Sequence, residues 1–182
     1  MSSITIRDAD PEGDAAACAA IYAPFVHSSA TSFEERPPTA EEFAARIRRT
    51  SLTHPWLVAE REEVAIAYAY ACPHRERPAY RWAADVSVYV VDGCRGLGVG
   101  RRLYEALFER LRAQRFRTAC AGITLPNEAS VALHERLGFV PAGVFRQIGW
   151  KAGAWRDVGW WQLELAPGSD EAPAEPLPPG AA

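Results

Sequence analysis

Three glycines, Gly96, Gly98 and Gly100, alternate between a stretch that is typical of a strand and one that is typical of a helix. Glycines at this spacing leave the backbone free to curl, so that its N–H groups point into one concavity at the positive end of the helix dipole. That concavity would bind a phosphate or a pyrophosphate. The run lacks the Gly-Lys-Ser/Thr ending of a P-loop and the spacing of a dinucleotide-binding loop. Taken alone, it is also compatible with a flexible turn that only caps the helix.

Two titratable residues, Asp85 and His134, are the candidates for proton transfer. Asp85 alternates with small and β-branched residues, as do Ser87 and Tyr89, which indicates a strand with one polar face. His134 falls in a helical stretch, and an imidazole titrates near neutral pH. Each has a structural alternative: Asp85 could pair with one of the many arginines, and His134 could be a satisfied histidine on an apolar helix face.

Two arginines, Arg75 and Arg77, occupy a charged loop before that strand. Guanidinium groups bind carboxylate or phosphinate oxygens two at a time, so this loop could hold an anionic ligand. A solvated charged loop is the alternative. Cys94 and Cys120 are typical of small buried residues, because no basic neighbour in the sequence favours a thiolate. We expect no metal site.

The elements that must position these residues follow from local patterns. Asp8 and Asp10 offer N-cap side chains after a short alternating stretch, and Thr39 to Glu42 has the form of a capping box after two prolines. Apolar residues recur at helical spacing after the glycine loop. Strands are expected at 4–7, 56–60, 64–71, 84–91, 118–124, 140–150 and 155–165, and helices at 14–25, from 39, after the glycine loop and at 127–137.

Composition limits what such a chain can do. Its 182 residues, with a net charge of −3 and 48% hydrophobic residues, suit one soluble globular domain. Near-neutral charge gives little electrostatic drive for binding nucleic acid. The longest stretch without Asp, Glu, Lys or Arg, 15–33, is interrupted by Pro24, His27 and several hydroxyl residues, so we expect no membrane span.

The ends of the chain and its cysteines bear on organisation and location. Acidic residues near the N-terminus argue against a secretory leader, and four cysteines without C-x-x-C spacing favour the reducing cytoplasm. Residues 167–182 are rich in Pro, Ala, Gly and Glu. We therefore expect a domain over 1–166 and a disordered tail over 167–182.

Together these motifs resemble the GCN5-related N-acetyltransferase (GNAT) superfamily. Its acetyl-CoA loop has the form Gln/Arg-x-x-Gly-x-Gly/Ala, matched here by Arg95-Gly96-Leu97-Gly98-Val99-Gly100. Four segments, 80–90, 122–127, 130–139 and 155–163, are similar to the phosphinothricin N-acetyltransferase branch. The resemblance covers about residues 3–166.

The resemblance implies an α/β GNAT fold: one mixed sheet of about seven strands with about four helices, splayed open between its fourth and fifth strands. Acetyl-CoA would lie in the split. Its pantetheine amides would bind a strand edge, its pyrophosphate would bind the glycine loop, and Asn127 would hold further amides. The acetyl-CoA-binding residues implied are Val88, Tyr89, Val90, Arg95, Gly96, Leu97, Gly98, Val99, Gly100, Arg101, Asn127 and Ser130.

The resemblance also assigns the catalytic residues. The branch has glutamate at the position of Asp85 as the proposed base, so this sequence departs from it by one methylene. His134 stands where most of the superfamily has a tyrosine that protonates the CoA thiolate, and its role as acid, base or orienting group stays open. The amine substrate would be bound by Phe33, Arg75, Arg77, Tyr80, Trp82 and Tyr89.

The implied activity is transfer of an acetyl group to the α-amine of a small amino acid such as phosphinothricin, methionine sulfoximine or methionine sulfone, and hence herbicide resistance. Another amine, such as a protein N-terminus, or a low-turnover acyl-CoA sensor are the alternatives; two arginines disfavour a polyamine. We also expect a homodimer, because Trp150, Trp155, Trp160 and Trp161 concentrate in the last hairpin.

Overall fold

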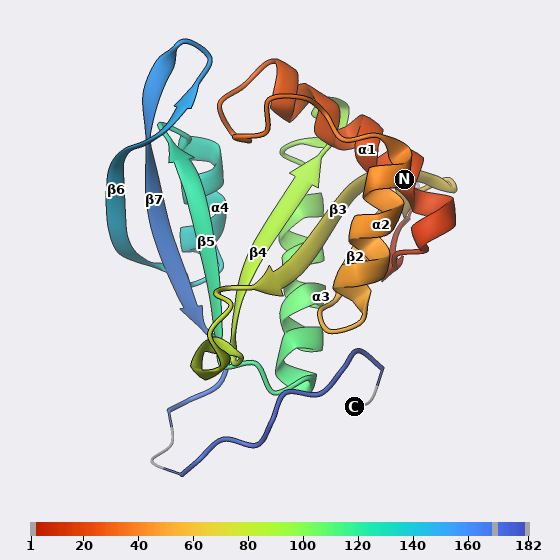
Figure 1. Ribbon diagram of the computed structural model, residues 1–182. Coiled ribbons are helices and arrows are strands. Elements are labelled where there is room, and N and C mark those ends of the chain that lie inside the picture. The colour runs from red at the N-terminus through yellow and green to blue at the C-terminus, as the bar shows by residue number, and fades with distance from the viewer. Residues whose placement is uncertain (1–2, 169–170, 181–182) are drawn as a thin grey trace.

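The computed structural model describes residues 3–168 and 171–180 (Figure 1). Seven strands and four α-helices occupy the described residues, which confirms the expected fold class. The elements are β1 (Ile4–Asp8), α1 (Pro11–His27), α2 (Ala40–Ser51), β2 (Trp56–Arg61), β3 (Val64–Pro73), β4 (Ala83–Val90), α3 (Val99–Ala113), β5 (Thr118–Leu125), α4 (Glu128–Arg136), β6 (Val140–Lys151) and β7 (Ala154–Glu164), with 3₁₀ turns at Pro78–Tyr80 and Asp92–Cys94.

The strands form one sheet in the order β1-β2-β3-β4-β5-β7-β6. Every neighbouring pair is antiparallel except β4 and β5, which are parallel. That parallel pairing joins only Ala83–Asp85 to Thr118–Cys120, and the two strands then diverge (Figure 1). The predicted splay between the fourth and fifth strands is therefore confirmed.

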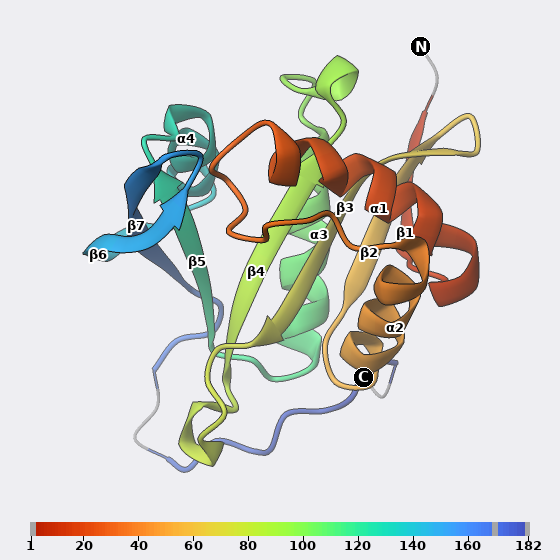
Figure 2. The ribbon, with the colours of Figure 1, turned by 45° about the horizontal axis from the view of Figure 1, so that its top comes forward.

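Helices cover both faces of the sheet, with α3 on one side and α1 and α2 on the other (Figure 2). Side chains alternate along a strand, so β3 serves both layers. Ala67, Ala69 and Ala71 are buried in the core that includes α3, whereas Tyr68 and Tyr70 pack in the core beneath α1 and α2. The small residues let α3 lie close to the sheet, and the aromatic residues fill the opposite layer.

The helix caps expected from the sequence are present. Asp10 accepts hydrogen bonds from two backbone N–H groups of the first turn, and Thr39 and Glu42 form a reciprocal capping box. Because Asp10 is the cap, α1 begins at Pro11, a residue suited to a first helical position, rather than at Asp14. None of the helices in the described ranges is long and apolar enough to cross a membrane.

The segment 174–177 contacts the domain, which its composition did not predict. Leu177 exchanges hydrogen bonds with Gln114, since its N–H donates to the Gln114 carbonyl at 2.9 Å and its carbonyl accepts from the Gln114 side chain at 2.7 Å. Trp82 donates its indole N–H to the Ala174 carbonyl at 2.9 Å. The segment therefore passes beneath one end of the sheet (Figure 1). The domain boundary at 166 stays a prediction.

Candidate active site

A groove of about 630 Å³ lies between β4, the glycine loop and α4; we call it the β4–α4 groove. It is the place where the resemblance puts acetyl-CoA. Two of the predicted residues do not line it: the Leu97 side chain is exposed, and the Tyr89 ring packs on Tyr22 and Phe25 beneath α1. The predicted residues that do line it are Val88, Val90, Arg95, Gly96, Gly98, Val99, Gly100, Arg101, Asn127 and Ser130.

The glycine loop forms an open cradle at the start of α3. Gly96 and Gly98 both have φ of +77°, a conformation that side chains disfavour, and no described atom lies within 4 Å of the position of a Cβ on either. Gly98 is the N-cap of α3, so the free N–H groups of the first turn face the groove. A Cβ on Gly100 would make only ordinary contacts of 3.6 Å with Leu133 and Val90. The cradle fits an anionic group such as a pyrophosphate.

One edge of β4 is open beside this cradle. β3 pairs with β4 from Ala84 to Val90, but β5 pairs with β4 only as far as Asp85. Over residues 86–90, no described strand occupies the side of β4 that faces β5. An extended chain of amides can bind such an edge through backbone hydrogen bonds. Asn127, opposite this edge, caps α4 by accepting from the Ser130 N–H at 3.2 Å, which leaves its amide N–H groups for a ligand.

His134 lies deep in the split, almost completely buried, and both of its nitrogens have partners. Nδ1 donates to the Ser130 carbonyl at 2.7 Å, and Nε2, at 3.1 Å, accepts from the buried Tyr104 hydroxyl. Burial lowers the pKa of His134, although the bond to Ser130 acts in the opposite direction. The imidazole is therefore neutral at neutral pH, beside a small cavity of about 70 Å³ that Ser87 and Gly122 also line.

Asp85 lies where the parallel pairing ends, between Cys72 on β3 and Cys120 on β5 in register. Its Oδ1 is 2.6 Å from Nδ1 of His74, the residue that follows β3. Both side chains are partly exposed, 25% for Asp85 and 17% for His74. Burial raises the pKa of Asp85, and the hydrogen bond from His74 offsets part of that effect. The pair places a carboxylate and an imidazole side by side.

Phe33 belongs to the loop between α1 and α2, which reaches across to the β6–β7 hairpin. A Cβ on Gly149 would collide with the Phe33 ring, so the ring rests directly on the hairpin backbone. Lys151 donates to the Glu34 carbonyl from the same hairpin. This loop thus links the two halves of the split sheet.

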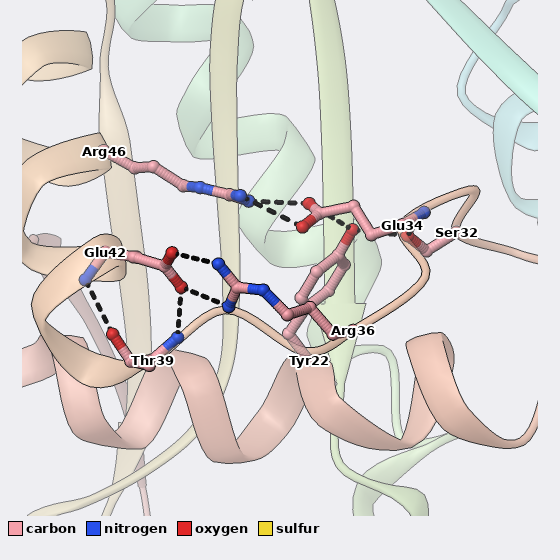
Figure 3. A network of polar contacts seen from close by, with 7 residues as sticks. All are labelled: Tyr22, Ser32, Glu34, Arg36, Thr39, Glu42 and Arg46. Carbon is pink, nitrogen blue, oxygen red and sulfur yellow. Dashed lines mark hydrogen bonds and ion pairs between the residues drawn. The ribbon is translucent and has the colours of Figure 1, made fainter.

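A polar network holds that loop in position (Figure 3). Arg46 of α2 binds both Glu34 carboxylate oxygens, at 2.7 and 3.0 Å, and Tyr22 of α1 donates to the same carboxylate. Arg36 and Glu42 form a second two-point pair. The hydrogen bonds from Arg46 lower the pKa of Glu34, against the effect of burial. The loop is therefore tied to both helices.

The other predicted substrate residues divide between two places. The Arg75 guanidinium lies 5.5 Å from the centre of a Trp160 ring, and the Tyr80 ring is 5.8 Å from that of His74, so both are near Asp85. Arg75 and Tyr80 also line a cavity of about 640 Å³, together with Arg77 and residues 175–178, and Trp82 binds Ala174. Arg77 and Trp82 thus face the C-terminal segment.

Three residues that the sequence analysis did not assign to the site belong to it: His74, Tyr104 and Trp160, the last of which was expected at a dimer surface. Strand alternation offered a signal for His74, which lies two residues after Cys72, but the strand was expected to end at residue 71 rather than at Pro73. Tyr104 gave no local signal, because its partner is 30 residues away.

Comparison with known proteins agrees with this geometry. The model of the acetyltransferase (GNAT) domain matches residues 6–160. The chain is 39% identical over 175 residues to a phosphinothricin N-acetyltransferase of Streptomyces viridochromogenes, covering 96% of this chain and 92% of that protein. It is 37% identical to an L-methionine sulfoximine/L-methionine sulfone acetyltransferase of Pseudomonas paraeruginosa, covering 91% and 96%.

A solved structure gives the same result. A phosphinothricin acetyltransferase from Sinorhizobium meliloti, in complex with AcCoA, superposes with a TM-score of 0.90 at 35% identity, covering 96% of this chain and 95% of that one. The match over most of the chain accounts for the split sheet and the glycine cradle together. This protein belongs to the GNAT family of acetyltransferases.

Proposed function

We propose that the protein transfers an acetyl group from acetyl-CoA to the α-amine of a small amino acid. The observation that carries this proposal is the parallel pairing of β4 and β5, which stops at Asp85. The open β4 edge and the glycine cradle then lie on one side of the stop, and a carboxylate lies at the stop itself. An acyl thioester bound along the edge would present its carbonyl near Asp85.

The surroundings of Asp85 favour an amino acid with an oxygen-rich side chain. Arg75 offers a guanidinium that binds anionic or tetrahedral oxygens, and the rings of Trp160 and Tyr80 lie against His74, the partner of Asp85. The relatives named for phosphinothricin and for the sulfoximine and sulfone of methionine act on amino acids of this kind.

The reaction that this site supports is direct attack. The amine nitrogen, freed of one ammonium proton, attacks the thioester carbonyl carbon; the C–S bond then breaks, and the amide nitrogen loses a second proton as the thiolate gains one. We propose Asp85 as part of the group that takes the first proton. His134 has both nitrogens occupied, which favours an orienting role over that of an acid.

Release of free thiol from acetyl-CoA with a panel of amines tests this function. We expect turnover with phosphinothricin, methionine sulfoximine and methionine sulfone, and little with spermidine or a peptide N-terminus. Mass spectrometry of the product should locate the acetyl group on the α-nitrogen. Preference for the peptide or the polyamine, or acetyl-CoA binding without turnover on any amine, would contradict the proposal.

We also propose a homodimer located in the cytoplasm. All four cysteines are free, which suits a reducing compartment. Trp160 and Trp161 are largely covered, so the expected four-tryptophan patch is reduced to Trp150 and Trp155. The exposed apolar residues of the hairpin are Val140, Val144, Phe145, Ile148, Trp150 and Trp155. A sedimentation mass near 40 kDa, twice the 20.0 kDa of one chain, would support the dimer, and a monomer mass would contradict it.

A further inference from the structure

Three functional side chains meet where the parallel pairing ends. Nitrogen of His74, carboxylate oxygen of Asp85 and Sγ of Cys120 all lie within 4.8 Å of one another, and they come from the end of β3, from β4 and from β5. Burial and the nearby Asp85 carboxylate raise the pKa of Cys120 to about 11, so at neutral pH it is a thiol. The reactive members of the group are His74 and Asp85.

We propose that His74 and Asp85 form a catalytic dyad in which Nε2 of His74 takes the proton from the substrate ammonium and Asp85 orients the imidazole. The proposal rests on the proposed function and identifies the atom that acts as base. It replaces a lone carboxylate by a carboxylate that acts through a histidine.

The hydrogen-bond geometry determines which nitrogen is free. A carboxylate only accepts, so at 2.6 Å the neutral imidazole carries its proton on Nδ1 and donates it to Asp85. The lone pair is then on Nε2, which has no hydrogen-bond partner within residues 3–168 and 171–180. The rings of Tyr80 and Trp160, each with its centre 5.8 Å from that of His74, pack edge-on with the imidazole.

This arrangement also explains how an aspartate can serve at position 85. Its carboxylate reaches one methylene less far than a glutamate on the same strand would. The imidazole extends the basic atom beyond the carboxylate by the width of a ring. His74 thereby restores the reach that the shorter side chain lacks.

The groups described above account for both protons that the substrate nitrogen loses. Nε2 accepts one proton from R–NH₃⁺, which leaves R–NH₂ and an imidazolium whose Nδ1–H still donates to the Asp85 carboxylate. After attack and C–S cleavage, the second nitrogen proton goes with the thiolate as free thiol. The partly exposed imidazolium then returns its proton to water.

The charged and titratable groups around the dyad are compatible with this role. Arg75 binds the His74 carbonyl at 2.7 Å and Tyr80 faces the ring, whereas Cys72 and Cys120 flank Asp85. Burial raises the pKa of Cys72, as of Cys120, to about 11, so neither thiol adds negative charge at neutral pH. The imidazolium would face one carboxylate and one guanidinium.

The decisive experiment compares His74→Gln with the double variant His74→Gln/Asp85→Glu. We expect His74→Gln to lower kcat/KM for the amine by about 10²-fold at pH 7. The loss should shrink as pH rises, because free amine becomes abundant. Glutamate at position 85 should recover at least about tenfold, since the longer carboxylate reaches the ammonium. His27→Gln, at an exposed position on α1, is the matched control and should behave as wild type.

A structural role for His74 would give a different pattern: a loss that is equal at every pH and is not recovered by Asp85→Glu. That pattern, or full activity of His74→Gln across the pH range, would overturn the dyad while acetylation by the wild type still supports the proposed function. A wild type that acetylates no amine would contradict the function instead. A chelator should leave the rate unchanged; a chelator effect that His74→Gln removes would show that the group holds a cation, and would overturn the dyad.

A measurement without substrate supplies an independent readout. The chain has four histidines, so ¹⁵N NMR of the free protein can resolve His74. We expect the tautomer with its proton on Nδ1 in the wild type, and loss of that preference in Asp85→Asn. The opposite tautomer in the folded wild type would overturn the proposal.

Discussion

The two ends of the cleft offer different chemical groups to a ligand. The β4–α4 groove presents backbone: the glycine cradle, the first turn of α3 and the open edge of β4. The other end, around His74 and Asp85, presents side chains, among them Arg75 from the loop after β3. Backbone recognises features that every acyl-CoA shares, whereas side chains can distinguish one amine from another. We therefore expect substitutions at the first end to affect binding of the donor, and those at the second to affect the amine and the chemistry.

The largest effect on acetyl-CoA binding should come from Gly98→Glu. The new side chain would strain a residue with φ of +77° and place a carboxylate in the anion cradle. We expect acetyl-CoA affinity, measured by calorimetric titration, to fall by at least about 10²-fold, since close like charges cost several kcal/mol. Gly100→Ala is the matched control, because a Cβ there meets only ordinary contacts. If Gly98→Glu binds acetyl-CoA as tightly as the wild type does, the glycine cradle is not the site that binds the donor.

Asp85→Asn should separate the two ends of the cleft most clearly. We expect kcat/KM for the amine to fall by about 10²–10⁴-fold near neutral pH, with acetyl-CoA affinity unchanged. Burial raises the pKa of Asp85, so the carboxylate gains its charge at a higher pH than an ordinary aspartate, and the wild-type rate should rise with pH through that range. An equal loss of acetyl-CoA affinity would mean that the ends are not independent.

Tyr104→Phe tests the middle of the split, where His134 lies. Removing the hydroxyl leaves Nε2 of His134 buried without its donor, which costs about 1–3 kcal/mol of the free energy of unfolding. We expect a drop in kcat of about tenfold if His134 only orients the donor, well below the effect of proton-transfer groups. Because burial lowers the pKa of His134, the pH profile of kcat should show no step from this residue near its ordinary value. If kcat of Tyr104→Phe falls as far as the rate of Asp85→Asn, His134 acts as the acid that protonates the thiolate.

The smallest effect should come from Arg46→Met, which breaks the network in Figure 3. We expect a loss of about 1 kcal/mol in the free energy of unfolding and a modest rise in KM for the amine. Arg46 lowers the pKa of Glu34, so the pair stabilises the fold above the ordinary glutamate pKa, and this contribution disappears as pH falls through the lowered value. Chemical denaturation at pH 7 and pH 3 should show the difference between variant and wild type shrinking at the lower pH.

The sequence predicted the backbone end of the cleft well, because that end is local. A glycine spacing, the helix after it and the strand before it are contiguous over residues 83–113, so the cradle could be inferred before any tertiary contact was known. The capping box of α2 followed from an equally local pattern, and the split between the fourth and fifth strands followed from the family resemblance.

The residue pairs at the side-chain end could not be predicted from local sequence patterns. The His74–Asp85 pair depends on the register between β3 and β4, and the Tyr104–His134 pair depends on how α3 and α4 pack. The contacts of segment 174–177 rest on Gln114 and Trp82, which lie far away in the chain. The composition indicates that this segment is poor in apolar residues, but it does not show that Gln114 and Trp82 offer hydrogen-bond partners for its backbone.

The link between Phe33 and Gly149 sets an order of assembly. The first half of the chain, with α1, α2 and the strands to β4, can bury much of its own core, but the Phe33 ring and the Glu34 carbonyl find their partners on the hairpin only after β6 and β7 have formed. Contacts between segments so distant in sequence form late in folding. During synthesis on the ribosome or refolding from denaturant, we therefore expect the link between the two halves to form last, and catalytic activity to return after Trp56 of the core beneath α1 and α2 has become buried.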